Sequence, residues 1–132
     1  MEKARIVHPG EVQPQPVARA RGALMAVLLG PELGVPHFVT RKFFLAPGGR
    51  IPAHSHPDLE HEQVVLRGEM VIGLDGQEHT VRAGDAVFIP AGCQHWYENR
   101  SSEPVEFLCV VPKTERYVTQ WHEDPPAGAF TP

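Results

Sequence analysis

The sequence predicts an all-β fold, an antiparallel sandwich or barrel with the jelly roll as the leading candidate. Fourteen prolines and twelve glycines divide the 132 residues into short apolar runs. These runs are rich in Val, Phe, Ile and Thr, which suit a pleated, half-buried surface. No stretch of the core shows sustained apolar residues at helical spacing. Many short strands separated by turns are typical of this fold class.

The predicted strands follow one another with turn signals between them. Asp75-Gly76 separates VIGL from QEHTV, and Ala83-Gly84 precedes DAVFIP; both are typical of tight turns between antiparallel strands. In chain order, the predicted strand runs are ALMAVLLG (23–30), HFVTRKFFLAPGG (37–49), HEQVVLRGEMVIGLDG (61–76), QEHTVRAGD (77–85), AVFIPAG (86–92), QHWYENR (94–100) and VEFLCVVP (105–112).

The length predicts one domain with a core that needs no disulfide support. We expect an extended arm or edge strand at 1–22, the β-barrel at 23–113 and a C-terminal tail at 114–132. The final stretch, HEDPPAGAFTP (122–132), has too little apolar content to order itself, so it is predicted to be flexible.

Composition sets limits on partners and location. The net charge is −4 and no run of Lys or Arg forms a basic stripe, so nucleic acid and anionic membranes are not expected partners. The beginning of the chain, MEKARIVHPGE, has no apolar core of a signal peptide, and no segment approaches the roughly 20 apolar residues of a membrane span. We therefore expect a cytoplasmic protein in which Cys93 and Cys109 stay as thiols.

Several predicted strands are apolar on both faces, which indicates that the outer face of the sheet is covered. Val64 and Leu66 alternate with Val65, and Phe43 and Phe44 point to opposite sides. A homodimer is the simplest explanation, and an arm or tail folded back over the sheet is the alternative.

Histidines gather at one place in the chain. In the stretch AHSHPDLEH, His54 and His56 are two apart and share a strand face, while His61 returns after a turn-like PDL. His95 follows the rigid PAG turn and is a fourth candidate. The other four histidines show no such grouping and are interpreted as surface or incidental residues: His8, His37, His79 and His122.

A lone histidine in a strand is more often an ordinary core or surface residue than a ligand. Several converging ones are different, because each buried imidazole without a partner costs on the order of a few kcal/mol. One bound cation supplies a partner to all of them. The sequence therefore predicts a metal site at His54, His56, His61 and His95.

Two stretches resemble the two sequence motifs of the cupin superfamily. The first motif reads G, five residues, H-x-H, three or four residues, E, six residues, G; the second reads G, five residues, P-x-G, two residues, H, three residues, N. The second is matched without gaps, and in the first His61 stands where most cupins have glutamate. The matching positions are Gly48, His54, His56, His61 and Gly68, then Gly84, Pro90, Gly92, His95 and Asn99.

The resemblance extends to small single-domain bacterial cupins with a four-histidine site. It implies a double-stranded β-helix (jelly-roll) barrel, commonly dimeric, that holds one divalent metal inside one end. Imidazole suits Fe, Mn, Cu, Ni and Zn, so the residues do not choose among these metals. An octahedral metal would leave two positions open for chemistry, whereas tetrahedral zinc would be closed and structural. Because ligation needs neutral imidazole, we expect metal affinity to fall below about pH 6.5.

Other pocket residues are predicted from strand alternation. Phe107 and Cys109 lie on the face opposite Glu106 and are expected to point inward, as cavity lining or as plain core. Arg41 is the candidate cation for an acidic substrate, with a surface position as the alternative. Trp96 and Tyr97 follow His95 directly, and one of them, with Trp96 as the candidate pocket residue, is expected to pack near the metal; either could instead only fill the strand.

Three functions fit these features. The first is a metal-dependent oxygenase, dioxygenase-like, that acts on a small enolisable or phenolic substrate. The second is a non-redox isomerase or lyase acting on a sugar acid, which would need a positioned general base that the sequence does not reveal. The third is a binding module or sensor for a small ligand. Each takes a small-molecule partner, and the fold alone does not decide among them.

Overall fold

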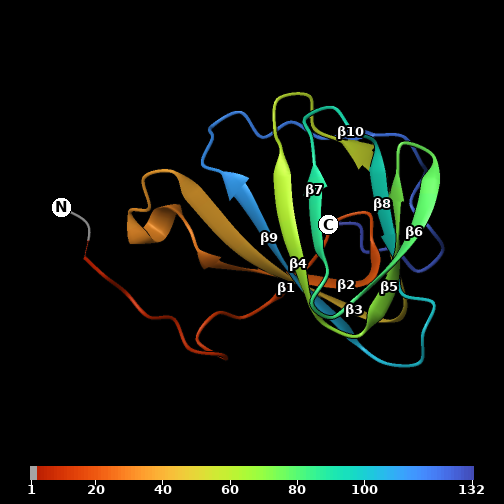
Figure 1. The fold of residues 1–132 in the computed structure, drawn as a ribbon, viewed down its shortest axis with the longest axis horizontal. Helices are drawn as coiled ribbons and strands as arrows, with labels where there is room; N and C mark the ends of the chain where they lie inside the picture. The colour runs from red at the N-terminus through yellow and green to blue at the C-terminus, as the bar shows by residue number, and fades with distance from the viewer. Residues whose placement is uncertain (1–2) are drawn as a thin grey trace.

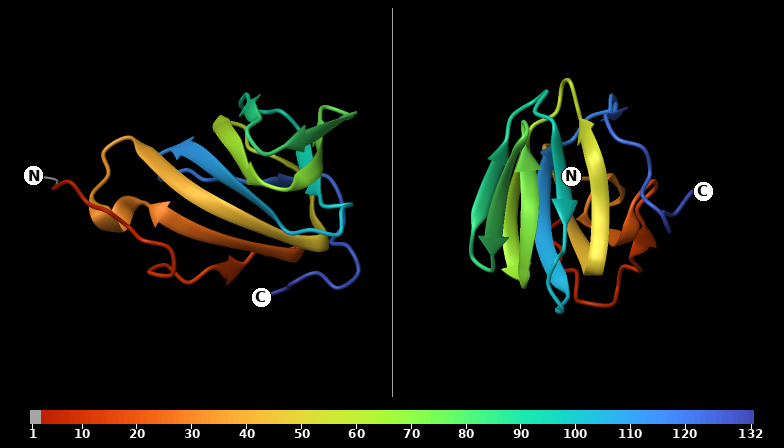
Figure 2. Two further views of the ribbon diagram at one scale, coloured as in Figure 1. Left: turned by 60° about the horizontal axis from the view of Figure 1, so that its bottom comes forward. Right: turned by 90° about the vertical axis from the view of Figure 1, so that its right-hand side faces the viewer.

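The structure, a computed structural model that describes residues 3–132, confirms the predicted all-β jelly roll. Its strands form one antiparallel sheet that curls on itself (Figures 1 and 2). Besides one 3-10 turn, η1 (Pro31–Leu33), the regular elements of the described residues are β1 (Gln15–Pro16), β2 (Arg21–Leu29), β3 (Phe38–Ser55), β4 (His61–Arg67), β5 (Glu69–Leu74), β6 (Gln77–Arg82), β7 (Ala86–Ile89), β8 (His95–Glu98), β9 (Val105–Pro112) and β10 (Gln120–Trp121).

The strand order β6-β5-β8-β3-β9-β4-β7 makes β3 the central strand of the barrel. Its first half, from Phe38 to Leu45, pairs with β9, and Thr40 to Leu45 also pair with β2 on the other side. Its second half pairs with β8, where His54 lies opposite His95. One 18-residue strand therefore links the two layers of the barrel and carries the first two motif histidines to its far end.

The bend in the middle of β3 requires glycine. A Cβ added to Gly49 would lie 2.7 Å from the carbonyl oxygen of Gly22 and 2.9 Å from that of Ala46. Only a residue without a side chain lets β2 and β3 approach so closely here. This bend turns the second half of β3 towards β8.

The barrel interior is apolar at one end and polar at the other. Met70 and Ile72 on β5 pack with Val105 on β9 in the apolar end, all of them almost fully buried. Phe107 lies at the boundary, with its ring stacked between Phe43 at 5.1 Å and Tyr97 at 5.0 Å between centroids. Beyond this stack the buried polar residues, histidine, arginine and glutamine, lie next to a second, smaller apolar cluster of Val39, Leu59, Cys109 and Val111.

The C-terminal tail is ordered, which corrects the expectation of a flexible segment. β10 pairs with the end of β3, the Glu123 carboxylate accepts from Arg50 at 2.7 Å, and the Phe130 amide donates to the Ala20 carbonyl at 2.8 Å. These are backbone hydrogen bonds and an ion pair to distant residues, so low apolar content did not predict them. In Figure 2 the tail runs along the outside of the barrel.

The beginning of the chain includes one short strand. β1 pairs with β2 as a short edge strand, although β2 begins at Arg21, two residues before the predicted run. Cys93 and Cys109 are both buried and free. Among the described residues, no helix has the length and hydropathy needed to cross a membrane.

Candidate metal centre

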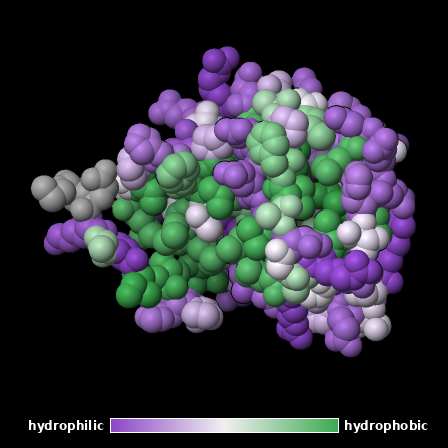
Figure 3. Space-filling model, viewed as in Figure 1, coloured by the Kyte–Doolittle hydropathy of each residue, from purple (hydrophilic) through white to green (hydrophobic). Residues whose placement is uncertain are grey.

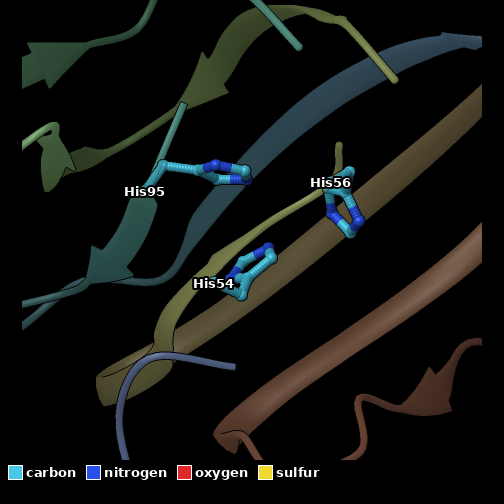
Figure 4. A group of neighbouring side chains, drawn as sticks. All are labelled: His54, His56 and His95. Atoms are coloured by element: carbon cyan, nitrogen blue, oxygen red, sulfur yellow. The ribbon is translucent and has the colours of Figure 1, made fainter. Parts of the chain in front are cut away.

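Three histidines converge at the polar end of the barrel. His54 and His56 lie at the end of β3, and His95 is the first residue of β8 (Figure 4). One ring nitrogen from each lies within 4.8 Å of the others, and the His54 and His95 ring centroids are 4.2 Å apart. Strand alternation places the first two on one face, and antiparallel pairing of β3 with β8 brings in the third.

Each of the three rings is held by a backbone carbonyl. His54 Nδ1 lies 2.7 Å from the Pro52 oxygen, His95 Nδ1 lies 2.9 Å from the Cys93 oxygen, and His56 Nδ1 lies 3.0 Å from the Val118 oxygen. A carbonyl oxygen only accepts, so each Nδ1 carries the proton and donates it. Nε2 of each ring therefore keeps a free lone pair, which is the arrangement found in metal-ligating histidines.

Burial keeps these imidazoles neutral. Loss of solvent, followed by the neighbouring His95, lowers the pKa of His54 to about 3. Burial likewise lowers the pKa of His95 to about 4 and also lowers that of His56. The three rings are thus unprotonated at neutral pH, the form that a divalent transition metal requires. The donor set, its orientation and its charge all fit such an ion.

His61 lies beside this cluster without joining it. Its ring centroid is 5.0 Å from that of His56 and 5.4 Å from that of His95. Its Nδ1 is buried and has no hydrogen-bond partner within residues 3–132. Burial, together with the charge of Arg41, lowers its pKa to about 2. The structure thus brings together three of the four predicted ligands, and coordination by His61 stays a prediction.

The cluster opens onto a cavity of about 250 Å³. Arg41, Gln63, Tyr97 and Cys109 form part of its wall beside the histidines, and none of its lining residues is acidic. Gln63 Nε2 donates to the Tyr97 hydroxyl at 2.6 Å and approaches Cys109 Sγ at 3.3 Å, while its Oε1 is buried without a partner in the described residues. The cavity lining thus combines apolar side chains with the histidines, Gln63 and the cation of Arg41, and includes no carboxylate of the described residues.

The structure separates the predicted pocket residues into two groups. Arg41 and Cys109 line the cavity, as expected from their strand face, whereas Phe107 is fully buried beneath it in the aromatic stack. Trp96 lies on the opposite face of β8, with the Arg50 guanidinium 4.6 Å from its ring centroid. Its indole occupies the space over Gly73, which a Cβ would block. The prediction that Trp96 packs near the metal is therefore wrong, because alternation turns it outward.

Other cavity residues were missed from the sequence. Gln63 is two residues from His61, so alternation would have found it. Tyr97 was treated as one of two alternatives with Trp96. Tyr117 and Trp121 belong to the tail: the Tyr117 ring lies 5.0 Å from that of His56, and Trp121 lies 5.2 Å from His54. No local pattern signals these two, because only tertiary folding brings the tail to the cavity.

One histidine outside the cluster also has a role near it. His122, interpreted as incidental, lies with Nε2 2.7 Å from the hydroxyl of Ser55, the residue between His54 and His56. This contact joins the residue after β10 to the last residue of β3.

Comparison with known proteins places the fold and the motifs in one family. The family described as "Cupin domain" matches residues 41–111, which cover most of β3 and all of β4 to β8. The chain is 31% identical to an oxalate-binding protein of Thermotoga maritima, over 80% of this chain and 92% of that one. It is 30% identical to the polyketide synthase CurC of Streptomyces cyaneus, over 98% of this chain and 82% of the relative.

A solved structure extends the likeness to three dimensions. The polyketide cyclase RemF of Streptomyces resistomycificus superposes with a TM-score of 0.85 at 32% identity, covering 93% of this chain and 90% of that one.

Proposed function

The chain belongs to the cupin-domain family, and on this premise we propose that it is a metal-dependent enzyme acting on a small enolisable or phenolic substrate. One divalent transition metal is held by His54, His56 and His95, with His61 as the fourth ligand. The single observation that supports this most strongly is the set of three Nδ1 to carbonyl contacts, which aim three neutral imidazoles at one point.

The absence of acidic residues from the cavity lining selects the substrate class. Among the lining residues there is no carboxylate to serve as a general base. A substrate that carries an acidic C–H or O–H of its own, such as a β-dicarbonyl compound or a phenol, fits this lining, because its proton can pass to solvent without a strong base. A bound divalent metal supplies Lewis acidity, which lowers the pKa of such a group and stabilises the resulting oxygen anion.

The chain's own residues hold and shield the reacting group. The backbone carbonyls fix the histidine rings, so little reorganisation accompanies substrate binding. On the tail side, the Tyr117 ring packs against His56 and the Trp121 ring against His54, which covers part of each imidazole. The cavity of about 250 Å³ lies below the usual size range for drug-like ligands, so it accepts a small molecule or the reacting end of a longer one.

Two reactions of such a substrate are proposed, and each has its own support. The likeness to a polyketide synthase protein and to a polyketide cyclase over nearly the whole chain favours ring closure through a stabilised enolate. The histidine-only donor set, which suits redox-active metals, favours a dioxygenase-like oxygenase.

The test begins with elemental analysis of protein purified without chelators or nickel resin. Protein reconstituted separately with Fe, Mn, Cu, Ni and Zn is then incubated with 2,4-pentanedione, catechol and a short poly-β-ketone ester. Oxygen uptake and product mass are recorded together. Oxygen uptake that requires a redox metal and disappears in His95→Ala supports the oxygenase function. A product formed without uptake supports cyclisation or another non-redox reaction, and tight ligand binding without turnover would instead indicate a sensor.

A homodimer is proposed from the outer face of the sheet. Val64 and Leu66 on β4 and Phe88 on β7 are 40%, 45% and 58% exposed, and Leu108 on β9 pairs with Val64 on the same face. Figure 3 shows apolar side chains gathered across the middle of this side of the molecule. Sedimentation equilibrium of the wild type and of Phe88→Glu tests this: a dimer that becomes a monomer supports it, and a monomeric wild type contradicts it.

A cytoplasmic location likewise stays a prediction.

A further inference from the structure

Arg41 is a buried cation that lacks an ionic partner. Its side chain is only 8% exposed, yet it forms no ion pair with any carboxylate of residues 3–132. Nη1 donates to the Tyr117 hydroxyl at 2.9 Å, Nη2 lies 3.1 Å from Cys109 Sγ, and Nε is buried with no partner in the described chain. A guanidinium in such surroundings is costly, because its charge is removed from water without compensation.

Arg50, another arginine with little solvent exposure, is paired with carboxylates of this chain. Arg50 contacts the Glu98 carboxylate at 3.1 Å and the Glu123 carboxylate at 2.7 Å. Carboxylates are abundant in this chain, whose net charge is −4, but none lines the cavity that Arg41 faces. No carboxylate of the described residues therefore acts as the counter-ion of Arg41.

We propose that the Arg41 guanidinium is the binding site for an anionic group of the substrate, a carboxylate or an enolate oxygen. The assignment rests on the proposed function, since the metal held by the histidines in the same cavity takes the other end of the substrate. The planar guanidinium provides parallel N–H donors that suit a carboxylate.

Tyr117 supplies the second donor of this site. Its hydroxyl oxygen accepts from Arg41, so its own O–H remains free to donate to an anion placed beside the guanidinium. Its ring lies 5.0 Å from the ring of His56, which links the anion site to the histidine cluster. The substrate class is thus narrowed from enolisable compounds in general to those that carry a negative charge.

A purely structural role for Arg41 predicts different behaviour. If Arg41 served to fix the tail through Tyr117, its replacement would lower stability and anions would have no effect on either protein. If it is an anion site, replacement by a neutral side chain relieves a buried charge, so stability stays level or rises while anion binding is lost.

The experiment measures binding of malonate and of its uncharged analogue malonamide by calorimetry. Wild type, Arg41→Gln, Arg41→Lys and the exposed control Arg82→Gln are each used with Mn²⁺ and after removal of metal with a chelator. We expect Arg41→Gln to bind malonate about ten- to a hundredfold more weakly, as for loss of a charge-assisted contact. Arg41→Lys retains part of the affinity, and Arg82→Gln is unchanged. Malonamide binding does not differ among the four proteins.

Tyr117→Phe keeps the proposal testable if Arg41→Gln fails to fold, because Tyr117 is about half exposed and its loss leaves the barrel intact. This variant is expected to bind malonate about tenfold more weakly, as for loss of one hydrogen bond to a charged group.

Two results would overturn the anion site: a wild type that binds malonate no better than malonamide, or Arg41→Gln with wild-type malonate affinity and full metal content. Failure of the proposed function looks different. In that case the wild type takes up no metal, while the metal-free protein still shows malonate binding that depends on Arg41.

Discussion

The two ends of β8 bury polar side chains in opposite ways. Asn99, which follows the last residue of β8, is fully buried, and its amide donates to the carbonyls of Leu45 and Glu103 at 3.1 and 2.8 Å. Its Oδ1 accepts from the amide and hydroxyl of Ser101 at 3.0 and 2.7 Å. At the histidine end, by contrast, buried atoms of Arg41, His61 and Gln63 are left without partners among the described residues.

We infer from this contrast that the paired polar groups at one end contribute to stability and the unpaired ones at the other end to ligand binding. A buried polar group with every hydrogen bond made fixes the local backbone, and Asn99 does this for the turn after β8. A buried polar group left unpaired is costly and is retained where a ligand completes its bonding. Fully paired polar groups such as Asn99 therefore maintain the fold, and the unpaired groups at the histidine end agree with the proposal that this end binds an ion and an anionic substrate.

The largest effect expected at the histidine end comes from His95→Ala. Removing one of three convergent ligands should weaken metal binding by more than about a hundredfold, beyond the loss seen when an outer contact is removed. The free energy of unfolding of the metal-free protein should change by only about 1 kcal/mol, because one hydrogen bond is lost. Metal titration against a chromophoric chelator and urea denaturation check both values. Wild-type metal affinity in this variant would contradict the assigned site.

The reverse result is expected at the apolar end for Asn99→Ala. This change removes the amide that donates to the Leu45 and Glu103 carbonyls and the oxygen that accepts from Ser101, and should cost about 3 kcal/mol of unfolding free energy. Metal content per folded chain should remain that of the wild type. Urea denaturation followed by tyrosine and tryptophan fluorescence measures the loss. A metal-deficient but fully stable variant would show that the two ends are not separable.

The pH dependence should reveal the buried histidines. The pKa of His54 is about 3 and that of His95 about 4 in the folded protein, below the 6.5 of an exposed imidazole. Protons therefore bind the unfolded chain more readily, so stability of the metal-free protein is full above about pH 6.5 and falls as the pH drops towards 4. Each histidine adds at most about 1.4 kcal/mol per pH unit to this fall.

Burial of the histidine rings lowers the pH at which we predict metal loss, compared with the pH of about 6.5 expected for exposed imidazoles. Because protons compete poorly for buried rings, the folded protein should retain metal well below pH 6.5, until acid unfolding begins. Dialysis at stepped pH, with metal content and circular dichroism read together, tests this. Loss of metal near pH 6.5 from protein that is still folded would contradict it.

The smallest effect is expected for His61→Glu. His61 stands beside the three anchored ligands and replaces the glutamate common in cupins, so a carboxylate there should keep metal affinity within about tenfold while changing reactivity. Elemental analysis and the substrate assay check this, with His95→Ala as the control that loses metal. Complete loss of metal from His61→Glu would mean that His61 is oriented differently from what its spacing indicates.

Much of the fold and of the site followed from local pattern. The alternation of His54 and His56, the return at His61 and the turn before His95 predicted a cluster, and the structure brings three of these residues together. The same alternation placed Arg41 and Cys109 inside. Counted from His95, it also turns Tyr97 inward and Trp96 outward, so the error for Trp96 came from treating a residue next to a predicted ligand as one that lies near the metal.

The sequence by itself determined the strands, their turns and the histidine motif, because these depend on residues a few positions apart. Only the tertiary structure decided that Arg41 has no counter-ion among the described residues, that its guanidinium contacts Tyr117, and that the tail lies over the cavity with the Val118 carbonyl bound to His56. Those features depend on contacts between residues 62 to 76 positions apart. No local composition encodes them, because their energy comes from groups that meet only after the sheet has closed.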